Sequence, residues 1–164
     1  MVNNFIIHVL GTAQDGGYPH AGCKDSCCLD IWDKPALHRL PASVALIDKK
    51  NKKFYLFDIT PNIKEQLHFL DQYNCQLSGI FITHAHIGHY VGLLDLGLEI
   101  MNTDNIPVYV MPRMKNFILQ NQPMAQLIEN NNIQLIDIQN NNLISISDLS
   151  IIPFEVPHRN ELSE

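Results

Sequence analysis

Short apolar runs parted by polar turns characterise the first half of the chain. Residues 5–10 form an apolar run that ends at Gly11, a length typical of a buried strand and too short for a stable helix. Two further β-prone runs, at residues 43–48 and 54–58, flank a turn rich in lysine. We therefore expect a first strand and then, after a long loop broken by glycine and proline, a β-hairpin.

Helical spacing begins at Thr60. Thr60 can cap a first turn, and Pro61 suits the first helical position. Ile63, Leu67 and Leu70 then recur on one face. A buried strand is expected at residues 79–83. The later elements expected are helices at residues 93–101, 113–121 and 126–130 and strands at 107–111, 133–138, 143–146 and 149–156. This alternation indicates an α/β (α+β) fold with helices packed on a sheet.

The composition is that of an ordinary globular protein. The chain has 164 residues, 46% hydrophobic and 17% charged, so we expect a single domain, 1–164. No run approaches the roughly 20 apolar residues of a membrane helix, and the first residues lack a basic segment and a cleavage site. These features predict a cytoplasmic protein with no membrane partner. The net charge of −6 argues against a nucleic-acid partner, which needs a positive face.

Three histidines lie close together directly after the run at residues 79–83. In an extended backbone His84 and His86 project to the same side, and a turn can return His89 beside them. Imidazole binds zinc, iron and related ions as a neutral ligand near neutral pH. His158, at the end of the last apolar run, is a candidate for a further ligand. The alternative is a surface loop that carries unrelated histidines.

Several motifs resemble one protein family. THAHIGHYVGL resembles the His-x-His-x-Asp-His signature of the metallo-β-lactamase superfamily. Within it, the chain is similar to the coenzyme PQQ synthesis protein B branch through LGTAQDGGYPHAGC, LFDITPNI, VYVMPRM and VPHRNELSE. The resemblance implies an αββα sandwich, incomplete at the C-terminus, because family members continue well past the last of these motifs. Half a sandwich exposes apolar sheet, so a homodimer is a further expectation.

The resemblance also implies roles for particular residues. His84, His86 and His158 would bind a first metal, and His89 would bind a second. Asp58 matches an acidic residue that supports the histidine loop, since metal-bound histidines usually donate their other N–H to a carboxylate. The alternative for Asp58 is a turn residue that bonds to local amides.

Gly88 departs from the signature, which has Asp at this place. The change removes an anionic ligand of the second metal and a proton acceptor. We therefore expect one catalytic ion with a position left for water, and we expect Gly88→Asp to raise hydrolysis. Gln14 and Asp15, in the loop after the first strand, are expected at the mouth of the site, where they could meet substrate.

Cys23, Cys27 and Cys28 gather in the same long loop. In a leaderless chain, clustered cysteines more often bind metal than form disulfides, and the resemblance implies a structural zinc at this place. His20 is a local candidate for the remaining ligand. The alternative is a set of reduced thiols with no metal, because the neighbouring side chains of Cys27 and Cys28 diverge.

Three hypotheses of function follow. The first is a metal-dependent hydrolase, with zinc as cofactor and a small-molecule ester or phosphodiester as substrate. The second is an oxidative enzyme of cofactor biosynthesis, with iron or manganese in the same site. The third is a non-catalytic metal-binding fragment, motivated by Gly88. The sequence has neither a G-x-S-x-G elbow nor a phosphate-binding loop, which argues against a serine hydrolase and a P-loop protein.

Overall fold

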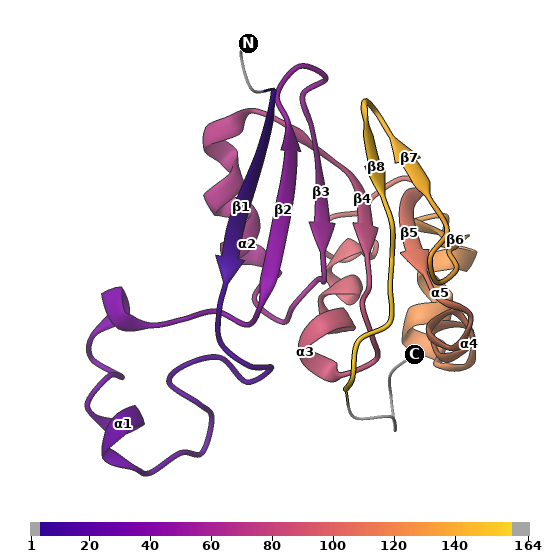
Figure 1. Cartoon of the computed structure of the whole chain (residues 1–164). Coiled ribbons are helices and arrows are strands. Elements are labelled where there is room, and N and C mark those ends of the chain that lie inside the picture. The colour runs from indigo at the N-terminus through magenta and orange to yellow at the C-terminus, as the bar shows by residue number, and fades with distance from the viewer. Residues whose placement is uncertain (1–3, 159–164) are drawn as a thin grey trace.

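A six-stranded sheet forms the centre of the fold (Figure 1). The computed structural model describes residues 4–158, and the sheet takes its strands in chain order. Each strand lies within a few residues of an apolar run that the sequence predicts. The strands are β1 (Phe5–Gly11), β2 (Ser43–Asp48), β3 (Lys53–Phe57), β4 (Gln76–Phe81), β5 (Ile106–Val110) and β6 (Ile133–Asp137).

Strand direction brings several loops to one edge of this sheet. β1 and β3 both run antiparallel to β2, and β3 to β6 run parallel to one another. β1 and β3 to β6 therefore all end at the same edge, which we call the carboxyl edge. The loop after β1 and the histidine loop after β4 both begin there. Ligands in sheets of this kind bind at that edge.

Helices connect the parallel strands and cover one face of the sheet (Figure 1). Ile47, Leu56 and Val108 of the sheet are fully buried, and they share one core with Ile63 and Ile118 of the helices. Within residues 4–158, no helix is long and apolar enough to span a membrane. The helices are α2 (Ile63–Leu70), α3 (Ile87–Tyr90), α4 (Pro112–Gln120) and α5 (Gln122–Glu129).

The opposite face of the sheet carries a second, two-stranded sheet, the hairpin of β7 (Ile144–Ile146) and β8 (Leu149–Ile151). Tyr55 and Phe81 alternate along their strands with residues of the main core, and they pack against Ile146 of the hairpin. Figure 1 shows the hairpin in front of the sheet and the helices behind it. The α/β class and the layering of a metallo-β-lactamase fold are thereby confirmed.

Two predicted elements are wrong in part. Residues 93–101 form no α-helix; a 3₁₀ segment, η3 (Val91–Leu96), is followed by turns. Leu93 and Leu96 are both fully buried, and their spacing suits the three residues per turn of a 3₁₀ helix. The strand expected at 149–156 ends at Ile151, because Pro153 and Pro157 have no amide to donate to a sheet. The last residues of the VPHRNELSE motif, 159–164, lie outside the described range.

A buried polar network anchors the segment between β3 and α2. The fully buried amide of Gln66 donates to the carbonyl of Pro41 (3.0 Å), and its side-chain oxygen accepts from the hydroxyl of Thr60 (2.8 Å). The Thr60 hydroxyl also accepts from the amide of Asn62 (3.1 Å), although α2 begins only at Ile63. The network ties the end of β3 to the segment that enters β2.

We expect Gln66→Leu to lower the free energy of unfolding by about 2 to 4 kcal/mol, because leucine removes the acceptor of the Thr60 hydroxyl and the side-chain donor to the Pro41 carbonyl. Gln72→Leu is the matched control. Gln72 is exposed and donates to the Phe69 carbonyl at the surface, so its loss should stay within about 0.5 kcal/mol. Urea denaturation followed by circular dichroism measures both variants. Equal losses would contradict the role given to the network.

Candidate metal centre

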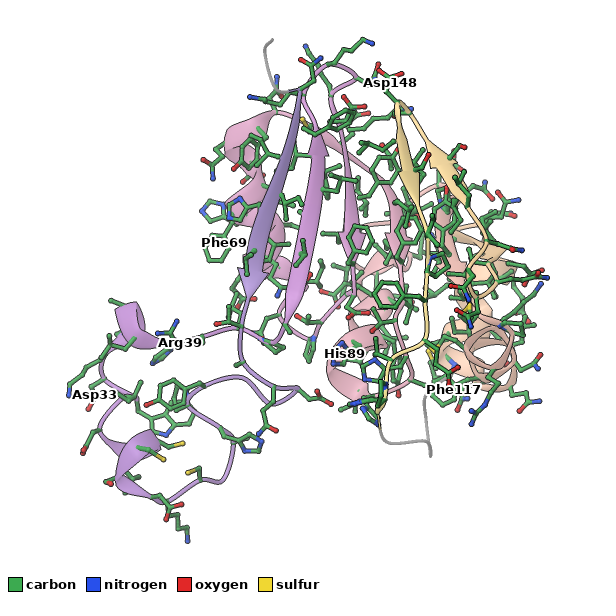
Figure 2. The ribbon with its side chains drawn as sticks, in the orientation of Figure 1. Asp33, Arg39, Phe69, His89, Phe117 and Asp148 are labelled. Atoms are coloured by element: carbon green, nitrogen blue, oxygen red, sulfur yellow. The ribbon has the colours of Figure 1, made fainter. Side chains whose placement is uncertain are left out.

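The histidine loop, residues 84–89, follows β4 at the carboxyl edge. His86 has extended backbone angles (φ −77°, ψ 141°), so the chain turns into α3 only after this residue. The amide of His89 donates to the carbonyl of His86 (2.9 Å), and this turn returns His89 toward the preceding histidines. Figure 2 shows His89 just past the ends of the central strands.

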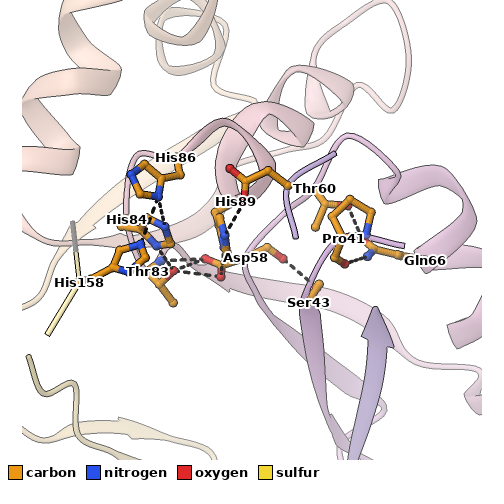
Figure 3. A network of polar contacts seen from close by, with 11 residues as sticks. Pro41, Ser43, Asp58, Thr60, Gln66, Thr83, His84, His86, His89 and His158 are labelled. Atoms are coloured by element: carbon orange, nitrogen blue, oxygen red, sulfur yellow. Dashed lines mark hydrogen bonds and ion pairs between the residues drawn. The ribbon is translucent and has the colours of Figure 1, made fainter. Parts of the chain in front are cut away.

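Three ring nitrogens converge beside this loop (Figure 3). Nε2 of His84 lies 2.9 Å from Nδ1 of His86, and Nε2 of His158 lies 3.2 Å from the same nitrogen. One donor atom from each ring lies within 4.8 Å of the others. We call His84, His86 and His158 the histidine trio. His86 is buried, His84 half-buried and His158 exposed, so the trio is open to solvent at His158.

One carboxylate orients two of the histidine rings (Figure 3). Nδ1 of His89 donates to Asp58 (2.7 Å), because an ionised carboxylate can only accept. The Thr83 hydroxyl donates to the same carboxylate (2.9 Å) and accepts from Nδ1 of His84 (2.8 Å). With Nδ1 protonated in both rings, Nε2 of His84 and Nε2 of His89 carry the lone pairs that can bind a metal.

Asp58 is the first residue after β3, and its backbone is fixed at both ends. Its φ of 66° lies in the left-handed region, which aspartate adopts more readily than most residues. Its amide donates to the Phe81 carbonyl (2.8 Å), and its carbonyl accepts from the Ser43 hydroxyl (3.0 Å). The carboxylate also accepts from the amide of Thr83 (2.8 Å). It therefore faces the histidine loop and not the amides of its own turn.

The two neighbouring rings differ in their affinity for protons. Burial, followed by the charge of His89, lowers the pKa of His84 to about 4. Burial also acts to lower the pKa of His89, but the hydrogen bond and the charge of Asp58 outweigh it and raise that pKa above its ordinary value. The ring centroids lie 4.1 Å apart. His84 is therefore neutral at neutral pH, which is the state that binds metal.

The histidine trio fits a divalent transition-metal ion. Lone pairs on three imidazole nitrogens repel one another at these distances unless a proton or a cation lies among them. Neutral imidazole suits zinc, iron and copper. Three protein ligands with an open position are the pattern of a catalytic site, whereas structural zinc sites are closed by four.

The loop after β1 reaches the other side of the histidine loop. Oδ1 of Asp15 lies 3.4 Å from Nε2 of His89. Burial acts to raise the pKa of Asp15, but the charge of His89 and the backbone amide of Gly88 hold it below its ordinary value. The side chain of Gln14, the other residue expected near substrate, is exposed.

The space beside Gly88 is already filled. A Cβ on Gly88 would lie 2.6 Å from Cβ of Asp15 and 2.8 Å from its Cγ. The Gly88→Asp substitution that the sequence suggests would therefore collide with Asp15 and displace the loop after β1. Sequence reasoning missed the contact between Asp15 and His89. Gly88 was the available signal, because glycine permits the close approach of a second segment.

The three cysteines gather apart from the histidines. Sγ atoms of Cys23, Cys27 and Cys28 lie within 4.8 Å of one another, and the two neighbouring cysteines belong to the short helix α1 (Ser26–Leu29). The amide of His20 donates to Sγ of Cys28 (3.4 Å), but the Nδ1 of its ring bonds to the carbonyl of Ala21 (3.0 Å). The described residues thus bring together the three thiols without the His20 ring. Figure 2 shows sulfur atoms around α1, well away from His89.

A cleft of about 740 Å³ opens beside the histidine trio, a volume within the range of small-molecule sites. Side chains of the sheet and of the segment after β8 form its walls, and most of them are apolar. The lining includes His84, His158, Phe57, Phe81, Ile151 and Phe154. A ligand in this cleft would therefore meet the open side of the trio.

A family model described as the beta-lactamase superfamily domain matches residues 54–163, more than half of the chain. Coenzyme PQQ synthesis protein B of Xanthomonas axonopodis pv. citri is 24% identical over 162 residues, which cover 92% of this chain and 52% of that protein. The same protein of Klebsiella pneumoniae is 30% identical over 99 residues, or 55% of this chain and 32% of that one. The chain thus spans about half the length of the curated relatives it matches.

Solved structures show the same fold. Zinc-bound PqqB from Methylobacterium extorquens superposes with a TM-score of 0.79 at 21% identity, over 92% of this chain and 56% of that one. A diphosphatase from the PhnP family gives a TM-score of 0.68 at 23% identity, over 91% of this chain and 57% of that one. At these identities the likeness concerns the fold and not the activity.

We expect Asp58→Asn to lower the pKa of His89 in the metal-free protein, because asparagine removes the charge that raises it. Since the folded-state pKa is raised, the stability that His89 contributes is present below its unfolded pKa of about 6.5 and is lost as pH rises through the folded value. The variant should therefore lose more stability at about pH 6 than at about pH 9.

Nitrogen-15 NMR of the imidazole rings measures this pKa directly. Asp148→Asn is the matched control, because Asp148 is an exposed partner of Lys50 (3.0 Å) at the opposite end of the sheet from His89 (Figure 2). It should leave the pKa of His89 unchanged. The account of Asp58 would be wrong if both variants titrated like the unmodified protein.

Proposed function

Because the chain belongs to the beta-lactamase superfamily, we propose that it acts as a metal-dependent hydrolase on a small-molecule ester or phosphodiester. The observation that carries the proposal is the convergence of three histidine nitrogens within 4.8 Å at the carboxyl edge of the sheet, beside the cleft. A metal ion bound there would polarise an ester or phosphoryl oxygen and lower the pKa of a water molecule.

The chain's own residues orient the site. Asp58 directly fixes the His89 ring and, through the Thr83 hydroxyl, the His84 ring. Such outer partners hold metal-binding rings in one tautomer and one orientation. The apolar walls of the cleft would bind the body of the substrate and exclude water, and its scissile group would lie beside His158.

Zinc is the ion that we propose. The donor set is compatible with it, and the solved PqqB from Methylobacterium extorquens is a zinc-bound protein. The fold is also that of a protein named as a diphosphatase, which supports a phosphorus ester as one substrate class. Iron in the same three-histidine site is distinguished from zinc by elemental analysis of the purified protein.

The hydrolase proposal is tested by His84→Ala, measured by metal content and by turnover of bis(p-nitrophenyl) phosphate and p-nitrophenyl acetate. We expect the variant to lose the ion of the trio and at least about 100-fold of the turnover, since even outer-shell changes cost 10- to 100-fold. His68→Ala is the control, because His68 is exposed on α2 and pairs with Asp71 (2.9 Å). Metal bound by the trio with no turnover of either ester would contradict the proposal.

We further propose that Cys23, Cys27 and Cys28 hold a structural zinc. Three soft thiolates within 4.8 Å are a donor set that zinc prefers, and a fourth residue would close the structural site. We expect Cys23→Ser to lose one zinc per chain while the ion of the trio stays. Cys75→Ser, which changes a cysteine outside this cluster, should lose none. Equal zinc content in the two variants would support reduced thiols without metal.

We propose that the chain acts as one domain, in the cytoplasm, and pairs as a homodimer through the exposed edge strand β1. Ile7 and Val9 of this strand are 71% and 56% exposed, and unpaired apolar edges favour association. Light scattering tests the assembly, and a monomer at all concentrations would rule the homodimer out.

A further inference from the structure

Gly88 and Asp15 share one space at the candidate centre. The position that a side chain on Gly88 would take is occupied by Asp15, first by its backbone Cα and then by its Cβ, 2.6 Å away, and its Cγ, 2.8 Å away. The two residues come from different loops, one after β4 and the other after β1. Both strands end at the carboxyl edge, so the fold itself brings the two loops together. The glycine thus leaves room for a carboxylate that another segment supplies.

The Asp15 carboxylate lies beside the second ring nitrogen of His89. Nδ1 of His89 donates to Asp58 at 2.7 Å, which leaves Nε2 as the ring nitrogen near Oδ1 of Asp15. That separation is 3.4 Å, whereas a charge-assisted N–H···O bond is about 2.7–2.9 Å long. Two ligands of one tetrahedral ion, each about 2.0–2.2 Å from the metal, lie about 3.3–3.5 Å apart. The spacing therefore suits a shared cation better than a direct hydrogen bond.

We propose that Asp15 and His89 hold a second divalent cation beside the histidine trio, with Asp15 providing the carboxylate that the histidine loop lacks at Gly88. The inference deepens the proposed hydrolase function and rests on its trio-bound ion. It also revises the expectation, drawn from Gly88, of a single catalytic ion.

The two sites are neighbours, because the ring centroids of His84 and His89 lie 4.1 Å apart. Ions bound by adjacent rings are compatible with the spacing of about 3.5–4 Å in two-metal hydrolytic sites. Asp15 is partly exposed, with 35% of its side chain accessible, and the His89 side chain is 17% accessible. The remaining positions of the ion are thus open to water or to an oxygen of the substrate. With two protein ligands, this ion should bind more weakly than the ion of the trio.

The experiment titrates the full, metal-free chain with Zn²⁺ by calorimetry and with Co²⁺ by absorption, and counts bound ions by elemental analysis. Asp15→Asn keeps the size of the side chain and removes its charge. We expect it to weaken the second ion by roughly 10- to 100-fold or to abolish it, while the trio and cysteine ions are retained. Asp33→Asn, an exposed aspartate of the same N-terminal loop (Figure 2), should bind as the unmodified protein does.

A second variant tests whether Asp15 needs the space that Gly88 leaves open. Gly88→Ala adds no ligand, but its Cβ pushes Asp15 away from His89, so it too should weaken the second ion. The inference is overturned if Asp15→Asn binds every ion with unchanged stoichiometry and affinity, or if the unmodified chain fills the trio but binds no further ion there. Turnover is read separately: a chain that binds both ions and hydrolyses no ester supports this inference and contradicts the proposed function.

Discussion

The hydrogen bond from Nδ1 of His89 to the Asp58 carboxylate, 2.7 Å long, joins the end of β3 to the histidine loop. The same carboxylate accepts from the amide and the hydroxyl of Thr83 (2.8 and 2.9 Å), and that hydroxyl accepts from His84. Two ring orientations and two tautomers thus depend on one buried group. A side chain that cannot accept these hydrogen bonds would leave the rings of His84 and His89 free to rotate, even with the sequence of the histidine loop unchanged.

Strand direction explains why so many chemical groups meet at this point. β1 and β3 to β6 end at one edge, so Asp15, Asp58 and His89 arrive from three separate strands. The segment after β8 crosses the open face of the sheet and adds His158. A core of fully buried strand residues such as Leu56 and Ile80 holds these ends in register. The site needs few contacts of its own because the sheet already positions its loops.

Local pattern was sufficient to predict part of this arrangement. The spacing of His84, His86 and His89 after an apolar run predicts a metal-binding loop, and the six strands of the main sheet follow from short apolar runs. The failures have physical causes. Leu93 and Leu96 fit a 3₁₀ turn as well as a helix, and residues 149–156 contain a proline that ends the strand.

The contact between Asp15 and His89 could not be predicted, because it depends on how a long loop without regular structure folds back on the sheet. From the sequence, Gly88 is interpreted as the loss of a carboxylate. In the structure, Gly88 leaves the space in which the carboxylate of Asp15 lies beside His89. The family resemblance pointed to four histidines, and the structure brings three of them, His84, His86 and His158, together. A comparison made position by position could not reveal a carboxylate supplied by a distant segment.

The most direct test of the account is anomalous X-ray diffraction from crystals of the metal-loaded protein, recorded at the absorption edge of the bound metal. The account predicts an anomalous peak about 2.0–2.1 Å from Nε2 of His84, Nδ1 of His86 and Nε2 of His158. A metal-loaded crystal with no peak among these three nitrogens, or with the His84 ring turned so that Nδ1 faces the ion, would contradict it.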